Sequence, residues 1–213
     1  AEFFESYCTM KEDSASDTCY CTEFQRVCRE LEKKVPELPF SNPWLAQNTV
    51  KRLPAGCELH LGILNTLRSW SLFEIAHEKM IEIHSNTGGF GIDGMVSTLL
   101  GSSLASPNKL FFGVIGDLAF FYDMNALGNR HVGNNIRLMV VNNGRGTEFR
   151  NYNHPAARFG ESADAYMAAY GHYGKKSHDL VRHYAEDLGF EYMSAETKEE
   201  YLDRIDDFLN TEQ

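Results

Sequence analysis

The chain has 213 residues, 43% of them hydrophobic, which suits one globular domain with an appended segment. Its formal net charge is -10 and its Lys and Arg are not clustered, which argues against nucleic-acid binding because phosphates are neutralised by concentrated positive charge. No apolar run approaches the roughly 20 residues of a membrane span and no leader peptide opens the chain, so we expect a soluble, cytoplasmic protein without a membrane partner.

The cysteines form no recognisable framework. They are odd in number, four of them lie near the N-terminus, and no two are spaced as CxxC. We therefore expect reduced, mostly structural thiols at Cys8, Cys19, Cys21, Cys28 and Cys57.

The first 55 residues have the pattern of a helical linker, and residues 56–213 that of a domain. Up to Tyr20 the chain is polar and unperiodic, and a helical spacing of apolar residues then runs to Pro36. A second helix is predicted from Asn42, with Pro43 in its first turn, to Leu53. We expect this segment to link the domain to a preceding one.

Beyond residue 56, short apolar runs alternate with helical stretches. This alternation is typical of a parallel sheet with helices on both faces, the doubly wound α/β class. The predicted strands are Glu58–Leu64, Glu82–Ser85, Leu110–Ile115, Ile136–Val141 and Glu191–Ala195.

The last predicted helix, Thr197–Asn210, places its apolar residues on one face, which must pack on another element. Domains of this class commonly return to the sheet after such a helix, so we expect that a final strand has been lost and that the chain was excised from a longer polypeptide. The apolar face consists of Tyr201, Ile205, Phe208 and Leu209.

Polar and glycine-rich turns follow three predicted strands, at the sheet edge where open parallel sheets bind ligands. Gly116-Asp117 ends one strand, Asn142 to Gly146 follow the next, and Ser85 to Gly91 follow a third. Asp117 and Asn143 would offer hard oxygens to Mg2+, whose coordination shell a diphosphate completes. Singly, Asp117 is equally a helix N-cap and Asn142-Asn143 a turn, but the combination favours the metal site.

The segment GDLAFFYDMNALGNRHVGNNIRLMVVNN resembles the GDG-to-NN signature of thiamine-diphosphate-dependent enzymes. The resemblance implies that Asp117 and Asn143 bind Mg2+ through their side chains and Arg145 through its carbonyl. Leu118 replaces the third residue of the signature, as it also does in the menaquinone-pathway branch. The same resemblance assigns further cofactor contacts to Gly116, Leu118, Ala119, Gly146 and Thr147.

Upstream, SNTGGFGIDGMVSTLLGSSLA is similar to the NRGASGIDG segment of the menaquinone-pathway synthase that joins 2-oxoglutarate to isochorismate. The resemblance places Ile92 as the apolar wedge that bends the cofactor, with Gly89 and Gly91 beside it. LHLGILNTLRSW similarly resembles the family's first strand and turn, which implies that Asn65 and Thr66 lie at the cofactor edge.

Two departures bear on the substrate. Thr87 stands where the menaquinone branch has a carboxylate-binding Arg, and Glu148 stands where an apolar residue is usual. In contrast, GTEFRNYNHPAARFG resembles thiamine-diphosphate proteins of capsule and surface-sugar gene clusters. The resemblance therefore implies a 2-oxo acid decarboxylase or carboligase that acts in surface or capsular polysaccharide biosynthesis.

In that family the activating Glu lies on a separate pyrimidine-binding domain, across a subunit interface. The resemblance thus implies that this chain holds half of an active site and works in a homo-oligomer, at least a homodimer, on a small 2-oxo acid. Within the chain, His154 is favoured over His131 and His172 as an acid or base. A substrate carboxylate has three candidate partners, Arg68, Arg145 and Arg150.

Two other functions fit parts of the pattern. Residues 89–94 read literally as GxGxxG between a strand and a helix, as in NAD-dependent dehydrogenases, but the turn is longer than the Rossmann form and Asn142 to Gly146 have no role there. The second alternative is a noncatalytic protein that keeps a thiamine-diphosphate pocket.

Overall fold

The computed structural model describes residues 19–151, 153–164, 166 and 179–211. The chain divides into two compact units, Ala1–Pro39 and Phe40–Gln213. The first contains α2 (Cys19–Glu32), and the second contains the sheet together with α3 (Asn42–Thr49), which the sequence had placed in the linker. Within the described ranges, no helix has both the length and the apolar character that crossing a membrane requires.

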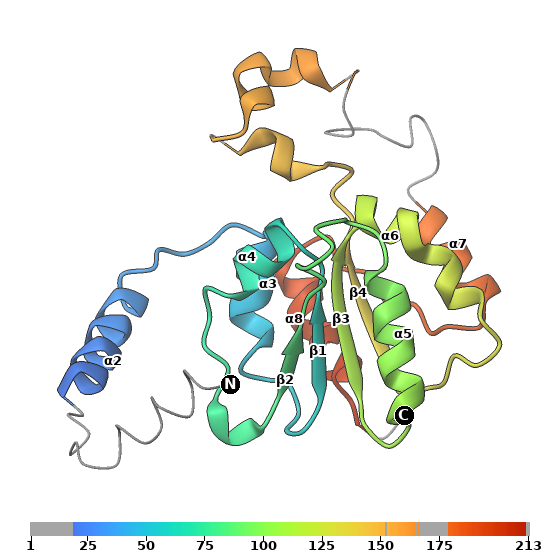
Figure 1. Ribbon diagram of the computed structural model, residues 1–213, viewed down its shortest axis with the longest axis horizontal. Helices are drawn as coiled ribbons and strands as arrows, with labels where there is room; N and C mark the ends of the chain where they lie inside the picture. Colours follow the sequence, from blue (N-terminus) through green and yellow to red (C-terminus); the bar gives the residue numbers. More distant parts are fainter. Residues whose placement is uncertain (1–18, 152, 165, 167–178, 212–213) are drawn as a thin grey trace, which may run out of the picture. The chain divides into compact units, whose positions relative to one another are not determined.

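The second unit is built on a four-stranded parallel sheet in the order β2-β1-β3-β4 (Figure 1). The strands are β1 (Glu58–Leu61), β2 (Glu82–His84), β3 (Phe111–Gly116) and β4 (Ile136–Val141). Each lies where an apolar run predicted one. The central strands β1 and β3 are buried on both faces, which is why their sequences show near-continuous rather than alternating hydrophobicity.

Helices cover both faces of the sheet, which confirms the doubly wound class. Ile115 of β3 packs in a cluster with residues of α5, α6 and α7. The next side chain back along the strand, Val114, points to the opposite face, as does Phe112, whose ring lies 5.8 Å from that of Phe208 in α8. The helices of this unit are α3, α4 (Asn65–Trp70), α5 (Met95–Ala105), α6 (Asp117–Asp123), α7 (Leu180–Asp187) and α8 (Lys198–Phe208), with 3-10 turns at His77–Lys79, Met124–Gly128, Thr147–Arg150 and Pro155–Ala163.

The predicted fifth strand, residues 191–195, is wrong. These residues form no strand, and β4 has no second neighbour within the described part of the chain. The Ser194 carbonyl accepts a hydrogen bond from Arg204 of α8 instead, and just after the segment the Glu196 N–H bonds to the Glu200 carboxylate at 2.7 Å. Tyr192 packs under α7 against the apolar cluster.

The strand order creates a switch point between β1 and β3. The chain runs from β1 outward to β2, then crosses back to β3 on the other side of β1. Connections after β1 and β3 therefore diverge, and the carboxyl edge at such a point is where open parallel sheets bind ligands. The turns that follow β1, β3 and β4 meet at this edge.

The predicted apolar face of α8 anchors this helix to the sheet. Ile205 is 2% exposed, whereas Leu202 on the same helix is 38% exposed. We expect Ile205→Ala to lower the free energy of unfolding by about 2–5 kcal/mol, because it leaves a cavity. Leu202→Ala is the matched control, with an expected change within about 0.5 kcal/mol. Urea unfolding measures both, and equal losses would show that α8 is not docked as described.

Cys57 is buried, and its burial raises the pKa of the thiol to about 11, whereas Cys21 and Cys28 are exposed and all three are free. Alkylation requires the thiolate, so we expect iodoacetamide at pH 8 to label Cys21 and Cys28 well before Cys57 in the folded protein. Peptide mass spectrometry measures the order of labelling. If all three cysteines were labelled at the same rate in the folded protein, and faster in urea, the burial of Cys57 would be contradicted.

Candidate functional site

Asp117 joins the ends of two neighbouring strands. β3 and β4 are in register up to the pair Gly116 and Val141, so the residues that follow emerge side by side. The Asp117 side chain is 2% exposed, and one carboxylate oxygen accepts a hydrogen bond from the N–H of Gly144 at 2.7 Å. The other accepts from the N–H of Leu118 at 2.9 Å. A buried carboxylate thus holds the turn after β4 against the turn after β3.

The turn after β4 depends on a glycine. Gly144 has φ +68°, a left-handed conformation that other residues adopt at a cost, and this directs its N–H to Asp117. Just before it, the exposed Asn143 accepts a hydrogen bond from the N–H of Arg145 through its amide oxygen, at 3.0 Å. The hydrogen bond between Asp117 and Gly144 therefore positions both predicted metal-binding side chains, because Asn143 directly precedes Gly144.

A polar network links the turn after β1 to the segment after β4. The Asn65 amide donates to the Thr147 hydroxyl at 2.7 Å, and Asn151 donates to Glu148 at 3.0 Å. Arg68 forms an ion pair with Glu148. Four side chains from segments about 80 positions apart thus hold the carboxyl edge together on the β1 side.

The backbone of this turn is strained. Leu64, which precedes α4, has φ 66°, a conformation that branched apolar residues rarely adopt. Thr66 is 4% exposed, and its hydroxyl faces the Asn42 amide of α3 at 3.4 Å. Asn42 also accepts a hydrogen bond from the Trp70 indole at 3.1 Å, so α3 fixes both ends of α4.

The loop between β2 and α5 borders an open hollow of about 520 Å³. Asn86 shapes it by donating to the Gly94 carbonyl at 3.1 Å and to the Thr98 hydroxyl at 2.9 Å. At the start of the loop, the Ser85 hydroxyl is buried without a hydrogen-bond partner among the described residues. The residues that line the hollow are Asn86, Gly88, Gly89, Gly91, Asp93 and Thr98, and they include two predicted cofactor contacts.

The remaining predicted residues lie on the segments that follow the four strands, with different degrees of exposure. Arg145 is exposed, as is Gly89. The half-buried ones are Asn65, Gly91, Ile92, Gly116, Leu118, Ala119, Gly146 and Thr147, and Ala119 also packs against the apolar cluster beneath α6. Turns made of small residues leave their backbone N–H groups accessible to an anionic ligand.

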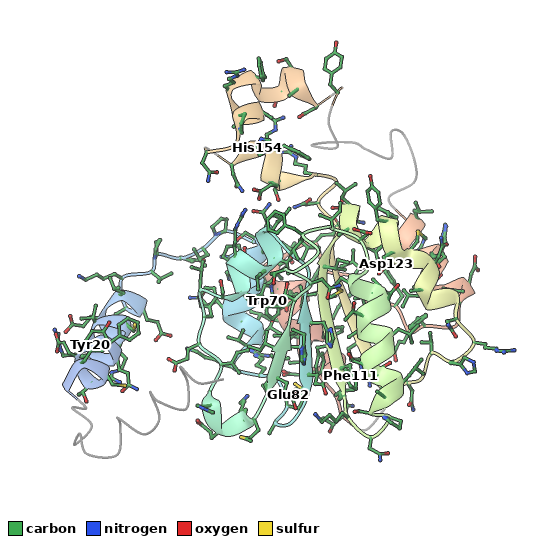
Figure 2. All side chains as sticks on the ribbon, in the orientation of Figure 1. Tyr20, Trp70, Glu82, Phe111, Asp123 and His154 are labelled. Carbon is green, nitrogen blue, oxygen red and sulfur yellow. The ribbon has the colours of Figure 1, made fainter. Side chains whose placement is uncertain are left out.

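His154, the favoured acid or base, has a structural task in the folded chain. It precedes the 3-10 turn Pro155–Ala163, its Nδ1 accepts the N–H of Ala156 at 3.1 Å, and its ring meets Phe149 edge to face at 5.3 Å (Figure 2). His131 lies in the loop that enters β4, at the amino edge of the sheet and away from the turns described above. His172 lies outside the described residues.

Two of the three candidate arginines are paired with carboxylates. Arg68 is bound to Glu148, and Arg150 lies 2.6 Å from both oxygens of Asp164. The structure also places the two residues that depart from the menaquinone branch. Glu148 forms an ion pair with Arg68, and Thr87 is an exposed residue of the loop beside the hollow.

The GxGxxG segment does not have the dinucleotide-binding arrangement. Residues 85–94 separate β2 from α5, and β2 is an outer strand of the described sheet rather than the strand at the switch point. A Rossmann fingerprint instead forms the tight turn directly after the central first strand. The geometry therefore favours the carboxyl edge of β1, β3 and β4 as the main site.

Several site contacts escaped the sequence analysis. The N–H of Gly144 is the donor that positions Asp117, and glycine after two asparagines was the available signal for a left-handed turn. The roles of Asn86 and Asn151 had no local signal, because their partners are set by tertiary packing.

The Gly144 turn can be tested through stability. An added Cβ at Gly144 meets no atom within 4 Å, so Gly144→Ala introduces only the backbone penalty at positive φ. We expect it to lower the free energy of unfolding by about 1–2 kcal/mol. Gly128→Ala is a matched control because it also meets open space without positive φ, and its expected change is below about 1 kcal/mol. Equal effects in thermal unfolding would contradict the turn.

Comparison with known proteins finds several relatives that share a name. The chain is 32% identical over 211 residues to the 2-succinyl-5-enolpyruvyl-6-hydroxy-3-cyclohexene-1-carboxylate synthase of Bacteroides fragilis, which covers 99% of this chain and 35% of that protein. It is 33% identical to the synthase of Phocaeicola vulgatus over 92% of the chain and 33% of the relative. It is 34% identical to the synthase of Bacteroides thetaiotaomicron, over 89% of this chain and 33% of that relative. No family model matches the chain.

The chain spans about a third of the length of these curated relatives. The similarity extends over almost all of the chain, including the turns after β1, β3 and β4. By sequence, then, the chain is related to the menaquinone-pathway synthases among the thiamine-diphosphate-dependent enzymes, as the motifs at its carboxyl edge predicted.

Proposed function

We propose that this chain is the diphosphate- and Mg2+-binding half of a thiamine-diphosphate-dependent 2-oxo acid decarboxylase or carboligase. The observation that carries the proposal is the buried Asp117 carboxylate, bonded to the N–H of Gly144 at the carboxyl edge of a parallel sheet. A buried carboxylate needs compensation, and at a ligand-binding edge a cation supplies it well. Asn143 and the carbonyl of Arg145 complete the proposed set of metal ligands.

The chemistry of these donors fits Mg2+. The ion prefers hard oxygen ligands and usually combines one or two protein side chains with phosphate and water. Asp117 and Asn143 both present oxygens, and each carboxylate oxygen has two lone pairs, so a backbone donor does not exclude a metal. The proposed diphosphate contacts are backbone groups of Gly116, Leu118 and Ala119.

The organic part of the cofactor has a proposed place on the other turns. The hollow of about 520 Å³ beside Gly89 and Gly91 lies on the loop that carries the proposed wedge, Ile92. The turns after β1 and β4 would border the organic part of the cofactor through Asn65, Thr66, Gly146 and Thr147. Of these, Thr66 contributes its backbone, because its hydroxyl is already directed at Asn42.

The cofactor supplies the carbanion chemistry, and the chain's residues bind and orient it. The group that activates it is proposed to be a Glu on a pyrimidine-binding domain, in the same polypeptide or in a partner subunit of a homo-oligomer. His154 is proposed to act on substrate only through its Nε2, since its Nδ1 accepts a backbone N–H. Residues 1–39 are proposed to link this domain to the rest of the longer protein.

The substrate is proposed to differ from that of the named relatives. Thr87 cannot bind a carboxylate as an Arg does, and Arg68 and Arg150 already pair with Glu148 and Asp164. A 2-oxo acid with one carboxylate fits this edge better than one with several. A role in surface or capsular polysaccharide biosynthesis fits the likeness of residues 146–160 to proteins of those gene clusters.

The alternative is a noncatalytic module that binds the same cofactor. Both functions need Asp117 and Asn143, so binding alone does not separate them. Decarboxylation of a panel of 2-oxo acids by the longer protein, lost when the Glu of its pyrimidine-binding domain is replaced by Gln, would support the enzyme. Cofactor binding with no turnover of any acid would support the module.

Calorimetric titration of thiamine diphosphate, with and without Mg2+, tests the proposal on the full chain. We expect Mg2+-dependent binding that Asp117→Ala weakens by about 2–5 kcal/mol, roughly 30-fold to several thousand-fold, because it removes a buried charged partner. Asp123→Ala is the matched control. Asp123 lies on the same helix (Figure 2) and also accepts two hydrogen bonds, from the Ser97 N–H at 2.8 Å and hydroxyl at 2.7 Å.

Unchanged affinity in Asp123→Ala and lost affinity in Asp117→Ala would support the site. Weak binding by this chain with tighter binding by the longer protein would fit a half-site. The absence of binding in both proteins, with each shown to be folded by circular dichroism, would overturn the proposal.

A further inference from the structure

Two neighbouring strands carry the same tripeptide pattern, Glu-apolar-His. It is Glu58-Leu59-His60 in β1 and Glu82-Ile83-His84 in β2. The strands are parallel, with Glu58 opposite Glu82 and His60 opposite His84. Residues two apart share a face of a sheet, so the register gathers two carboxylates and two imidazoles on one face.

The ligand atoms of three of these residues lie close together. The Oε2 atom of Glu58 is 3.5 Å from the Nε2 of His84 and 3.8 Å from the Nε2 of His60. All three atoms lie within 4.8 Å of one another, and the two imidazole centroids are 5.0 Å apart. Ligands around a tetrahedral zinc ion lie about 3.4 Å apart, about 1.6 times a bond of roughly 2.1 Å. A small contraction would therefore close the site around an ion.

His60 gives an independent indication that something is bound there. Its side chain is 3% exposed, and its Nε2 is buried without a hydrogen-bond partner among the described residues. Buried polar nitrogens are normally satisfied, and an unsatisfied one costs about 1–3 kcal/mol.

The charges around the cluster also suit a cation. Lys109 bridges the two glutamates, with its ammonium 3.0 Å from Oε1 of Glu58 and 2.9 Å from Oε1 of Glu82. One ammonium thus faces two carboxylates. The Oε2 atom of Glu58, which faces the imidazoles, is not the one that Lys109 holds.

We propose that Glu58, His60 and His84 form a second metal site, for Zn2+ or a similar borderline divalent ion. Two imidazole nitrogens, one carboxylate oxygen and a water are a common zinc set, whereas Mg2+ prefers oxygen ligands alone. Water has access to the open position, because the side chain of His84 is 45% exposed. The ion would tie the outer strand β2 to the buried strand β1.

This site lies apart from the proposed cofactor site. Glu58 and Glu82 begin their strands and Lys109 precedes β3, so the carboxylates and the ammonium lie toward the amino edge of the sheet, whereas His84 ends the short strand β2. Figure 2 labels Glu82 and Phe111 near that end, whereas α4 and α6 begin at the opposite end (Figure 1). The two sites can therefore be tested separately.

The test is a titration of the full chain with Zn2+ by calorimetry and with Co2+ by visible absorption, without thiamine diphosphate or Mg2+. Thiols near the N-terminus would bind the same ions, so every protein carries Ser at positions 8, 19, 21 and 28 and retains the buried Cys57. We expect one equivalent to bind, with the absorption of tetrahedral Co2+. His84→Gln, at a solvent-accessible ligand, should weaken binding at least tenfold.

The matched control is His183→Gln, an exposed histidine on α7, which should leave binding unchanged. Lys109→Met separates a metal site from a purely structural ion pair. In a metal site, removing the neighbouring ammonium strengthens Zn2+ binding several-fold, and Zn2+ restores the thermal stability that the variant loses. In a structural ion pair, Lys109→Met is destabilised and Zn2+ does not restore it.

Stoichiometric binding that His84→Gln weakens and His183→Gln does not, with retained binding in Asp117→Ala, would support the site. Binding that is absent, or equal in the two histidine variants, would overturn it. If saturating Zn2+ left the melting temperature of Lys109→Met unchanged, that result would also count against the proposed site.

Discussion

The contact between the Asp117 carboxylate and the Gly144 N–H organises the functional edge of this protein. It is a charge-assisted hydrogen bond at 2.7 Å between two turns that the parallel register of β3 and β4 brings side by side. Because Asp117 is buried, the bond is made away from water, and the left-handed Gly144 is required for its direction. The proposed metal ligand Asn143, the loop that carries Thr147 and the network to Asn65 all continue from this point.

The central strands β1 and β3 were predictable because burial on both faces leaves a nearly continuous apolar run, whereas β2 is exposed. The strands β1, β2, β3 and β4 all lie within a residue or a few of their predicted ends. The segment at residues 191–195 was also apolar enough to suggest a strand, but the carbonyl of its Ser194 bonds to the Arg204 side chain of α8. Tertiary packing decides whether a short apolar segment pairs with a strand or packs against a helix, and its periodicity does not distinguish the two.

The positions of the candidate site residues were predictable where they come just after strand ends, as Asp117 and Asn143 do. It was not predictable where a side chain meets a partner far along the chain. The Arg68–Glu148 pair joins positions about 80 residues apart, and His154 proved to cap a 3-10 turn. The two Glu-apolar-His tripeptides were visible in the sequence, yet only the register of β1 and β2 shows that they face each other.

The central claim is that Asp117 and Asn143 hold a divalent cation with the diphosphate of thiamine diphosphate. A crystal structure of the longer protein grown with thiamine diphosphate and Mn2+, which replaces Mg2+ and scatters anomalously, tests it directly. The expected result is an anomalous peak within about 2.0–2.3 Å of side-chain oxygens of both residues and of the diphosphate. A cofactor bound elsewhere, or a peak that these two side chains do not contact, would contradict the claim.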